Sequence, residues 1–502
     1  MTMQPFLPRL RFKMVRSGLV GLAWLSVLLS GRDAAAQDAS VCPDQLDADI
    51  QSILNQPSVR SSRWGIAVRT TPTSGEEGDW LYQKNTTQFF VPASNAKIFV
   101  TAAALNTLGE DYRIRTSIYQ ESTGKQNEIV LRVQGHGDPS LSDQQLQSLV
   151  TQLRDRNISQ IDHLIIDDSY FPGDWVSPSW EAEDVQAGYG APANSLILNQ
   201  NAINITLYPQ RVGQPLRLVW ENPQESTGWQ VQNNTRTVSR SEGESIYVGR
   251  DMTRPILYLD GQLQEGSEPD LSAIAITDPT AYFRDHLRSA LTQAGIQVNQ
   301  IQLETKPNSQ VGDEIAFINS APLIDLITEA NQNSTNLYAE ALLRLLGVLD
   351  SPQTSSALSA GAQAIPRLLS PLGVDSRGVT LADGSGLSRQ NLVTPAAIVA
   401  TLDGMARSPN ADAYRNSFAV AGVSGTLKSR FQNTDVVGQL WGKTGTLRDA
   451  VALSGYLHPD HYEAITFSIL VNDPALSIAS ARQAMDDIVL LLNGLQNCQE
   501  NI

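Results

Sequence analysis

Hydrophobic positions near the start of the chain predict one strand and one buried helix. Residues 64–70 form a short, mostly apolar run of the kind found in core strands. Residues 94–108 are apolar on nearly every side, and Gly109, a residue common at helix ends, follows them. A helix that is apolar all round is expected to be buried. This part of the chain therefore contributes a strand and a central helix to a core.

The pattern changes between residues 110 and 310. Short alternating segments are separated by Gly, Asn and Pro, which predicts closely spaced strands. The clearest strand signals are 129–133, 203–207 and 256–259, and longer helical periods occur at 143–156 and 279–294. We interpret residues 110–310 as a mainly β insert of one or two subdomains.

Helical periodicity returns after residue 310 and gives way to three strands. Helices are expected at 322–330 and 337–347, strands at 437–446, 451–457 and 464–471, and an amphipathic helix at 476–495. Three strands joined by short turns and covered by a terminal helix form an α+β layer, which the strand at 64–70 can join. We therefore predict one discontinuous domain from residues 37–109 and 311–502, with an antiparallel sheet flanked by helices.

The extreme N-terminus has the three features of a secretory signal in the right order. Arg9, Arg11, Lys13 and Arg16 make it basic, residues 17–29 are apolar, and Ala34-Ala35-Ala36 is a small-residue cleavage site. The apolar run is shorter than the ~20 residues that cross a bilayer. We expect residues 1–36 to be removed and the protein to reach the periplasm or cell-envelope space without a membrane span; the alternative is an uncleaved anchor.

Charge and cysteine content narrow the partners and the compartment. The formal net charge of −16 argues against nucleic acid and anionic lipid as partners, because both are negatively charged and would repel the chain. Cys42 and Cys498 are the two cysteines of the sequence. They are too far apart for a short-spaced zinc site, and in an oxidising compartment they are either bonded to each other or two free buried thiols.

Ser94 and Lys97 open the predicted buried helix. Residues three apart lie on one helical face, so the hydroxyl and the amine can meet. A hydroxyl needs a base to become a nucleophile, and a lysine can serve once burial lowers its pKa. Phe90, Ile98 and Phe99 supply apolar surroundings for this. Taken alone, the pair is also compatible with a helix-capping serine and an exposed lysine.

Two further polar motifs follow in the second half of the chain. Ser334-Thr335-Asn336 lies between two predicted helices, where a short turn can project polar side chains, although it could also be an ordinary helix cap. Lys443-Thr444-Gly445-Thr446 lies in a predicted strand, and a glycine inside a strand often marks a close approach of a ligand. A solvated strand lysine is the other interpretation of Lys443.

The three motifs in this order match the signature S-x-x-K, S-D-N and K-T-G of serine β-lactamases and penicillin-binding proteins. The middle motif departs from it as S-T-N, which keeps the serine and the asparagine. The interval between Ser94 and Ser334 is much longer than in compact β-lactamases, because it contains the whole β-rich insert. For this reason the chain resembles the S13 family of low-molecular-mass penicillin-binding proteins, which are D-alanyl-D-alanine carboxypeptidase/endopeptidases. Five further stretches fit that family: 135–141, 167–171, 383–389, 421–427 and 453–456. The resemblance implies a transpeptidase-like domain of the serine β-lactamase and DD-peptidase fold.

The resemblance also implies roles and partners. Ser94 is the expected nucleophile, Lys97 its base, Ser334 a proton relay and Asn336 a ligand of the substrate amide. Lys443, Thr444, Gly445 and Thr446 would bind the end of the substrate. Arg389 would bind the side-chain carboxylate of a diaminopimelyl residue, and either Asp167 or Asp168 its amine. Expected ligands are peptidoglycan peptides and β-lactams, with no cofactor and no metal; neither the oligomeric state nor the balance between the two peptidase activities follows.

Three other interpretations fit the sequence less well. A Ser-His-Asp hydrolase is disfavoured because the sequence has no G-x-S-x-G elbow. A penicillin sensor without activity should lack part of the motif set or carry a membrane span. His458-Pro459-Asp460-His461 could bind a metal, but it falls in a predicted hairpin turn without further ligands and is better interpreted as a surface turn.

Overall fold

The protein is described by a computed structural model that covers residues 41–72, 78–122, 128–306, 312–473, 475 and 477–498. The predicted export signal lies outside these residues. The described residues divide into two compact units, one formed by residues 181–192 and 201–279 and the other by the described residues within 41–180, 193–200 and 280–498. Among the described helices, none combines the length and the apolarity that crossing a bilayer requires. The predicted boundaries of the insert, 110 and 310, stay a prediction.

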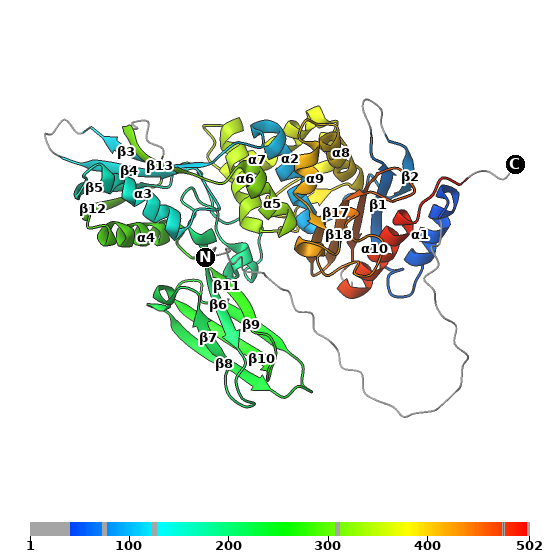
Figure 1. Cartoon of the computed structure of the whole chain (residues 1–502), viewed down its shortest axis with the longest axis horizontal. Coiled ribbons are helices and arrows are strands. Elements are labelled where there is room, and N and C mark those ends of the chain that lie inside the picture. The colour runs from blue at the N-terminus through cyan, green and yellow to red at the C-terminus, as the bar shows by residue number, and fades with distance from the viewer. Residues whose placement is uncertain are drawn as a thin grey trace, which may run out of the picture. The chain divides into compact units, whose positions relative to one another are not determined.

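The larger unit is built around a six-stranded antiparallel sheet in the order β16-β17-β18-β19-β1-β2. Its strands are β16 (Ala419–Val420), β17 (Leu440–Leu447), β18 (Ala450–Leu457), β19 (Ile465–Asn472), β1 (Arg63–Thr70) and β2 (Trp80–Lys84). The predicted meander and the addition of the N-terminal strand are both confirmed. Figure 1 shows the early blue strands beside the late orange ones in this sheet.

Each face of the six-stranded sheet has its own hydrophobic core, because successive strand side chains point to opposite faces. On β18, Leu453 packs with α1 (Leu46–Leu54) and α10 (Ile478–Asn493), whereas Ala452 packs on the other face with α2 (Ala96–Leu108). The helices of that second layer are α5 (Leu323–Gln332), α6 (Asn336–Asp350), α7 (Ala357–Leu369), α8 (Pro395–Ala406) and α9 (Ala411–Asn416), with the short ladder β14 (Val379–Thr380) and β15 (Leu392–Val393). The buried helix α2 is thus central, as its apolar sequence predicts.

A second sheet in the larger unit is mixed and five-stranded, in the order β12-β5-β4-β3-β13. It contains β3 (Arg115–Glu121), β4 (Val130–Gly135), β5 (Gln160–Asp167), β12 (Gln297–Glu304) and β13 (Asp313–Asn319), with α3 (Asp143–Asp155) and α4 (Pro279–Gln293) packed on it. The expected helices at 143–156 and 279–294 are confirmed. A complete capping box between Ser142 and Gln145 fixes the start of α3.

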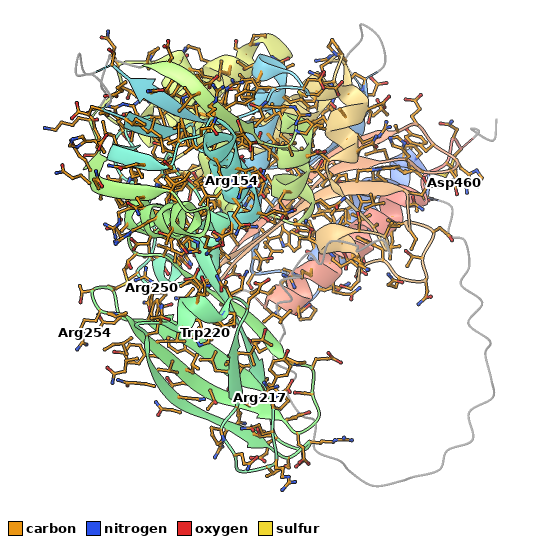
Figure 2. The ribbon with its side chains drawn as sticks, turned by 60° about the vertical axis from the view of Figure 1, so that its left-hand side comes forward. Arg154, Arg217, Trp220, Arg250, Arg254 and Asp460 are labelled. Carbon is orange, nitrogen blue, oxygen red and sulfur yellow. A yellow bond between two sulfur atoms is a disulfide. The ribbon has the colours of Figure 1, made fainter. Side chains whose placement is uncertain are left out.

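The smaller unit is all-β over its described residues. One sheet joins β11 (Asp270–Ala275), β6 (Ala202–Tyr208) and β7 (Arg217–Trp220), and the other joins β8 (Gln230–Val238), β10 (Ile256–Gln264) and β9 (Ser245–Arg250). Arg250 connects β9 to the first segment of the unit by donating to the carbonyl of Val185 at 3.2 Å. Figure 2 labels Arg250 together with Arg217 and Trp220 of β7.

Candidate active site

Ser94 lies at the start of α2, on a backbone that approaches two glycines closely. The preceding Ala93 has a φ of 47°, which non-glycine residues rarely adopt, and the turn 93–95 leads directly into the helix. A Cβ atom added to Gly386 would come within 1.9 Å of the Ala93 carbonyl oxygen, and one added to Gly445 within 3.0 Å of the Ser94 nitrogen. The tight fit places Ser94 against strand β17 and against the loop 383–389.

Lys97 meets Ser94 within hydrogen-bond distance in a fully buried position. Its Nζ donates to Ser94 Oγ at 3.0 Å, to Asn336 Oδ1 at 2.7 Å and to the carbonyl oxygen of Ser385 at 2.6 Å. Burial lowers the pKa of Lys97 to about 7, although the charges of Asp383 and Glu340 oppose the shift. A lysine with this pKa can accept a proton from the adjacent hydroxyl near neutral pH.

The middle motif forms the turn between α5 and α6. Ser334 has a φ of 62°, a left-handed conformation, and Thr335 occupies the N-cap position of α6. Glu329 accepts hydrogen bonds from the Thr335 hydroxyl at 2.5 Å and from Asn333 Nδ2 at 2.7 Å. These bonds hold the strained turn, and α6 then begins with Asn336 directed at Lys97.

Lys443 reaches the middle motif from strand β17. Its Nζ is fully buried and donates to Ser334 Oγ at 2.8 Å and to the Thr444 carbonyl oxygen at 2.9 Å. Burial lowers the pKa of Lys443 well below its ordinary value, and the nearby charge of Lys97 lowers it further. The five residues predicted to be catalytic therefore lie together as two contacting groups, Ser94–Lys97–Asn336 and Ser334–Lys443.

Two buried carboxylates that the sequence analysis assigned no role organise the loop next to Lys97. Glu340 Oε1 accepts from the amides of Gly384 and Ser385 at 2.9 and 2.8 Å, and its other oxygen accepts from Arg344. Asp383 accepts from the amides of Gly386 and Ser388 and from Trp180 Nε1. These bonds fix the carbonyl of Ser385 that receives Lys97. The i, i+4 spacing of Glu340 and Arg344 inside an apolar helix was the available signal.

The residues expected to bind the diaminopimelyl end occupy different surroundings. Arg389 is partly exposed, and its Nε lies 3.7 Å from Asp449 Oδ1 beyond the end of β17. Asp167 is buried and accepts from Arg132 at 2.9 Å and from the amide of Ser169. Asp168 is buried and accepts from Asn194, from Thr280 and from the amide of Ser195. The carboxylates of both aspartates therefore already accept hydrogen bonds from donors within the protein.

Asp138, which the sequence analysis did not single out, is a third buried carboxylate. Its Oδ1 accepts from the amide and the hydroxyl of Ser140, while Oδ2 is buried and has no hydrogen-bond partner among the described residues. Burial raises the pKa of Asp138 to about 6. The charge of Asp138 helps to raise the pKa of Tyr338, in the first turn of α6, after the larger effects of burial and of Glu329 on α5. The G-H-G-D-P-S-L stretch was the signal for this residue, and it had been used only for the resemblance.

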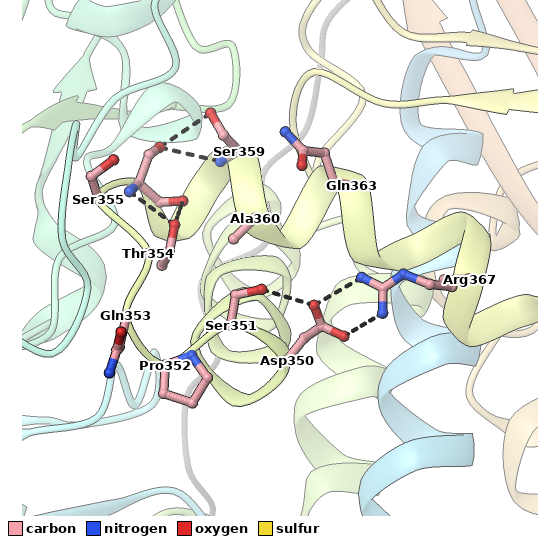
Figure 3. Close-up of a pocket in the computed structure, with 11 residues that line it drawn as sticks. Asp350, Ser351, Pro352, Gln353, Thr354, Ser355, Ser359, Ala360, Gln363 and Arg367 are labelled. Atoms are coloured by element: carbon pink, nitrogen blue, oxygen red, sulfur yellow. Dashed lines mark hydrogen bonds and ion pairs between the residues drawn. The ribbon is translucent and has the colours of Figure 1, made fainter.

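A polar hollow elsewhere in the same unit does not share these features. It lies between the end of α6 and the start of α7, where Arg367 donates to both oxygens of Asp350 at 2.7 and 2.8 Å (Figure 3). Among its described lining residues there is no lysine or histidine to activate a nucleophile. Over the described residues, no group of three His, Cys, Asp or Glu side chains could hold a metal ion, and His458 and His461 lie in the turn between β18 and β19.

Comparison of the sequence and of the structure with known proteins points to one family of peptidases. The profile of the D-Ala-D-Ala carboxypeptidase 3 (S13) family matches residues 46–495. A D-alanyl-D-alanine carboxypeptidase of Actinomadura sp. (strain R39) is 29% identical over 91% of this chain and 86% of its own. A penicillin-sensitive carboxypeptidase A of Dictyostelium discoideum is 28% identical, over 88% and 90%. The crystal structure of penicillin binding protein 4 from Haemophilus influenzae superposes with a TM-score of 0.74 at 24% identity, over 88% of this chain and 98% of that one.

Proposed function

The chain belongs to the D-Ala-D-Ala carboxypeptidase 3 (S13) family, and on this basis we propose that it is a serine peptidase that cleaves D-Ala-D-Ala peptides of peptidoglycan through an acyl-enzyme on Ser94. The observation that carries the proposal is the contact between Ser94 Oγ and the buried Lys97 Nζ at 3.0 Å. Enzymes of this family can act as carboxypeptidases or as endopeptidases. The names of the similar proteins support the carboxypeptidase reaction.

The proposed mechanism uses each of the five clustered side chains. Ser94 Oγ attacks the carbonyl of the penultimate D-Ala while Lys97 takes the hydroxyl proton. Ser334, which Lys443 orients, passes a proton to the leaving amine, and Asn336 holds the substrate backbone. The amides of Ser94 and Thr446 would stabilise the oxyanion. Water then releases the acyl group, and the leaving amine is either D-Ala or the cross-linked residue of an endopeptidase substrate.

The site should also accept β-lactams. A Haemophilus influenzae penicillin binding protein 4 of this fold has been crystallised with a β-lactam. Because the leaving group of a penicillin stays tethered after the ring opens, we expect it to acylate Ser94 and to leave slowly. The substrate lies outside the cytoplasm, which agrees with the predicted export signal and with the disulfide between Cys42 and Cys498.

Recognition of a diaminopimelyl end is a further part of the proposal. Arg389 remains the candidate for its carboxylate, since a partly exposed guanidinium suits a carboxylate. For its amine, Asp167 and Asp168 were the expected partners. Asp138 is the better candidate, because an unpartnered buried carboxylate oxygen gains more from an ammonium than one that already accepts from protein donors.

Hydrolysis by matched serine variants tests the proposed function. The wild-type protein should release D-Ala from a peptide that ends in D-Ala-D-Ala, and Ser94→Ala should release none. Ser142→Ala is the control: it removes the cap of α3, which costs about 1 kcal/mol of stability, and should keep full activity. Equal activity in wild type and Ser94→Ala would refute the assignment of the nucleophile.

A further inference from the structure

The terminal carboxylate of a D-Ala-D-Ala peptide needs a cation, and Lys443 is poorly placed to provide one. Its side chain has no exposed surface, and its Nζ already donates to Ser334 Oγ and to the Thr444 carbonyl oxygen. An anion would have to displace one of these bonds to reach it. The exposed part of the third motif is instead Thr446, at the end of β17.

Arg482 of the C-terminal helix α10 contacts that exposed threonine. Its NH2 group donates to Thr446 Oγ1 at 2.9 Å. The neighbouring carboxylate on α10, Asp486, forms an ion pair with Arg430. The charges of Arg482, Arg430, Asp486 and Asp487 interact here, and among the described contacts it is Arg482 that reaches Thr446. An arginine keeps its charge at every physiological pH and offers planar paired donors that suit a carboxylate.

The geometry of β17 places Thr446 at the right distance from the nucleophile. Strand β16 pairs only with Trp441 and Gly442, so among the described residues no strand pairs with 443–447 on that edge. Gly445 lies against the Ser94 amide. A peptide that lies along this open edge with its attacked carbonyl at Ser94 has its terminal carboxylate one residue further, about 3.8 Å along the chain. Thr446 is likewise one residue beyond Gly445.

We infer that Arg482 binds the terminal carboxylate of the substrate together with the hydroxyl of Thr446. This inference rests on the proposed function and adds to it the residue that selects for a free C-terminus. Lys443 then acts behind the strand, as the partner of Ser334. Arg482 comes from a helix outside the three motifs and was not predicted from the sequence.

Two peptides that differ only at the C-terminus test the inference. One ends in D-Ala-D-Ala with a free carboxylate and the other in D-Ala-D-Ala-amide, and kcat/KM is measured for both. Arg482→Ala should lower kcat/KM for the carboxylate peptide roughly ten- to a hundredfold, the scale of a charged hydrogen bond, and should change the amide peptide little. Arg482→Gln keeps a hydrogen-bond donor for Thr446 but has no charge. It should likewise lose the preference for the carboxylate peptide over the amide peptide.

Arg430→Ala is the matched control, because it removes a neighbouring arginine that pairs with Asp486 rather than with Thr446. It should keep the wild-type preference for the carboxylate. An equal loss on both peptides in Arg482→Ala, or an unchanged preference in Arg482→Gln, would overturn the inference and leave Arg482 as a support of β17. Benzylpenicillin and its methyl ester form a second pair of compounds, one with a free carboxylate and one without. Arg482→Ala should slow acylation by benzylpenicillin and change acylation by the ester little.

If wild-type protein reacts with none of the four compounds, the proposed function itself fails.

Discussion

At the residue scale, the chemistry of the site follows from burying two lysines side by side. Phe90, Ile98 and Phe99 are fully buried, as their positions in the sequence predict, and Ile98 and Phe99 follow Lys97 directly on α2. What the sequence did not reveal is the third acceptor of Lys97, the carbonyl of Ser385, because a backbone contact between distant segments leaves no trace in residue type. The buried carboxylates Glu340 and Asp383 were also missed, although the i, i+4 spacing of Glu340 and Arg344 was visible in the sequence.

The pKa of Lys97 predicts how activity varies with pH. The base acts only when neutral, so acylation by benzylpenicillin should be constant well above pH 7 and fall about tenfold per unit below it. Lys97→Ala should acylate at least about a hundredfold more slowly at pH 8. Stopped-flow or quenched acylation rates between pH 5 and pH 9 give the profile. A rate that rises only above pH 9, as for an ordinary lysine, would contradict the assignment of Lys97 as the base.

At the element scale, periodicity identified four of the six strands of the large sheet, β1, β17, β18 and β19, together with helices α2 to α6 and α10. No prediction was made for β2, β16, α1, α7, α8 or α9, and α7 shows the reason most clearly. Gly361 and Pro366 lie inside this helix, and both residues lower helix propensity. The structure gives a reason for the glycine: a Cβ at Gly361 would come within 2.1 Å of the Leu343 carbonyl oxygen, and Gly347 on α6 faces α7 equally closely. Close helix packing therefore offsets the cost, which the sequence alone cannot show.

The loop 383–389 also requires a glycine, at position 386. Its φ of 85° and the 1.9 Å approach to the Ala93 carbonyl oxygen leave no room for a side chain. Gly386→Ala should therefore displace the start of α2, reduce acylation of Ser94 strongly and lower the melting temperature. Gly373→Ala is the control, since its φ is 86° but the nearest atom to a Cβ, on Arg407, is 3.9 Å away.

Gly373→Ala should cost only the backbone strain, about 1 kcal/mol, and keep wild-type acylation. Thermal melts and acylation rates of the two variants separate the effects. Normal acylation by Gly386→Ala would mean that the loop does not support the nucleophile.

At the scale of the whole molecule, both ends of the described chain belong to one unit. The strand that follows α1 pairs with β19, and helices α1 and α10 pack on the same face of the sheet. The sequence predicted this meeting of distant segments from the strand and helix patterns. It left the state of the cysteines open, and the structure pairs Cys42 with Cys498 at a Cα–Cα distance of 5.6 Å.

The disulfide should stabilise the protein without taking part in the chemistry. It joins residues 456 positions apart, and native disulfides commonly contribute about 2–4 kcal/mol. Cys42→Ser and Cys498→Ser should each lower the free energy of unfolding by that amount, and the double variant should lose no more than either. Benzylpenicillin acylation at 25 °C should be unchanged. Alkylation of both thiols in unreduced wild-type protein would show that the bond does not form.

The mass of the intact protein after incubation with benzylpenicillin tests the central claim most directly. The account predicts a single adduct with the full mass of the antibiotic, located on the peptide that contains Ser94 and stable for hours. Ser94→Ala should acquire no adduct. A stable adduct on a different serine, or labelling of Ser94→Ala to the same extent as wild type, would contradict the assignment of Ser94, and rapid loss of the adduct would indicate a β-lactamase instead of a peptidase.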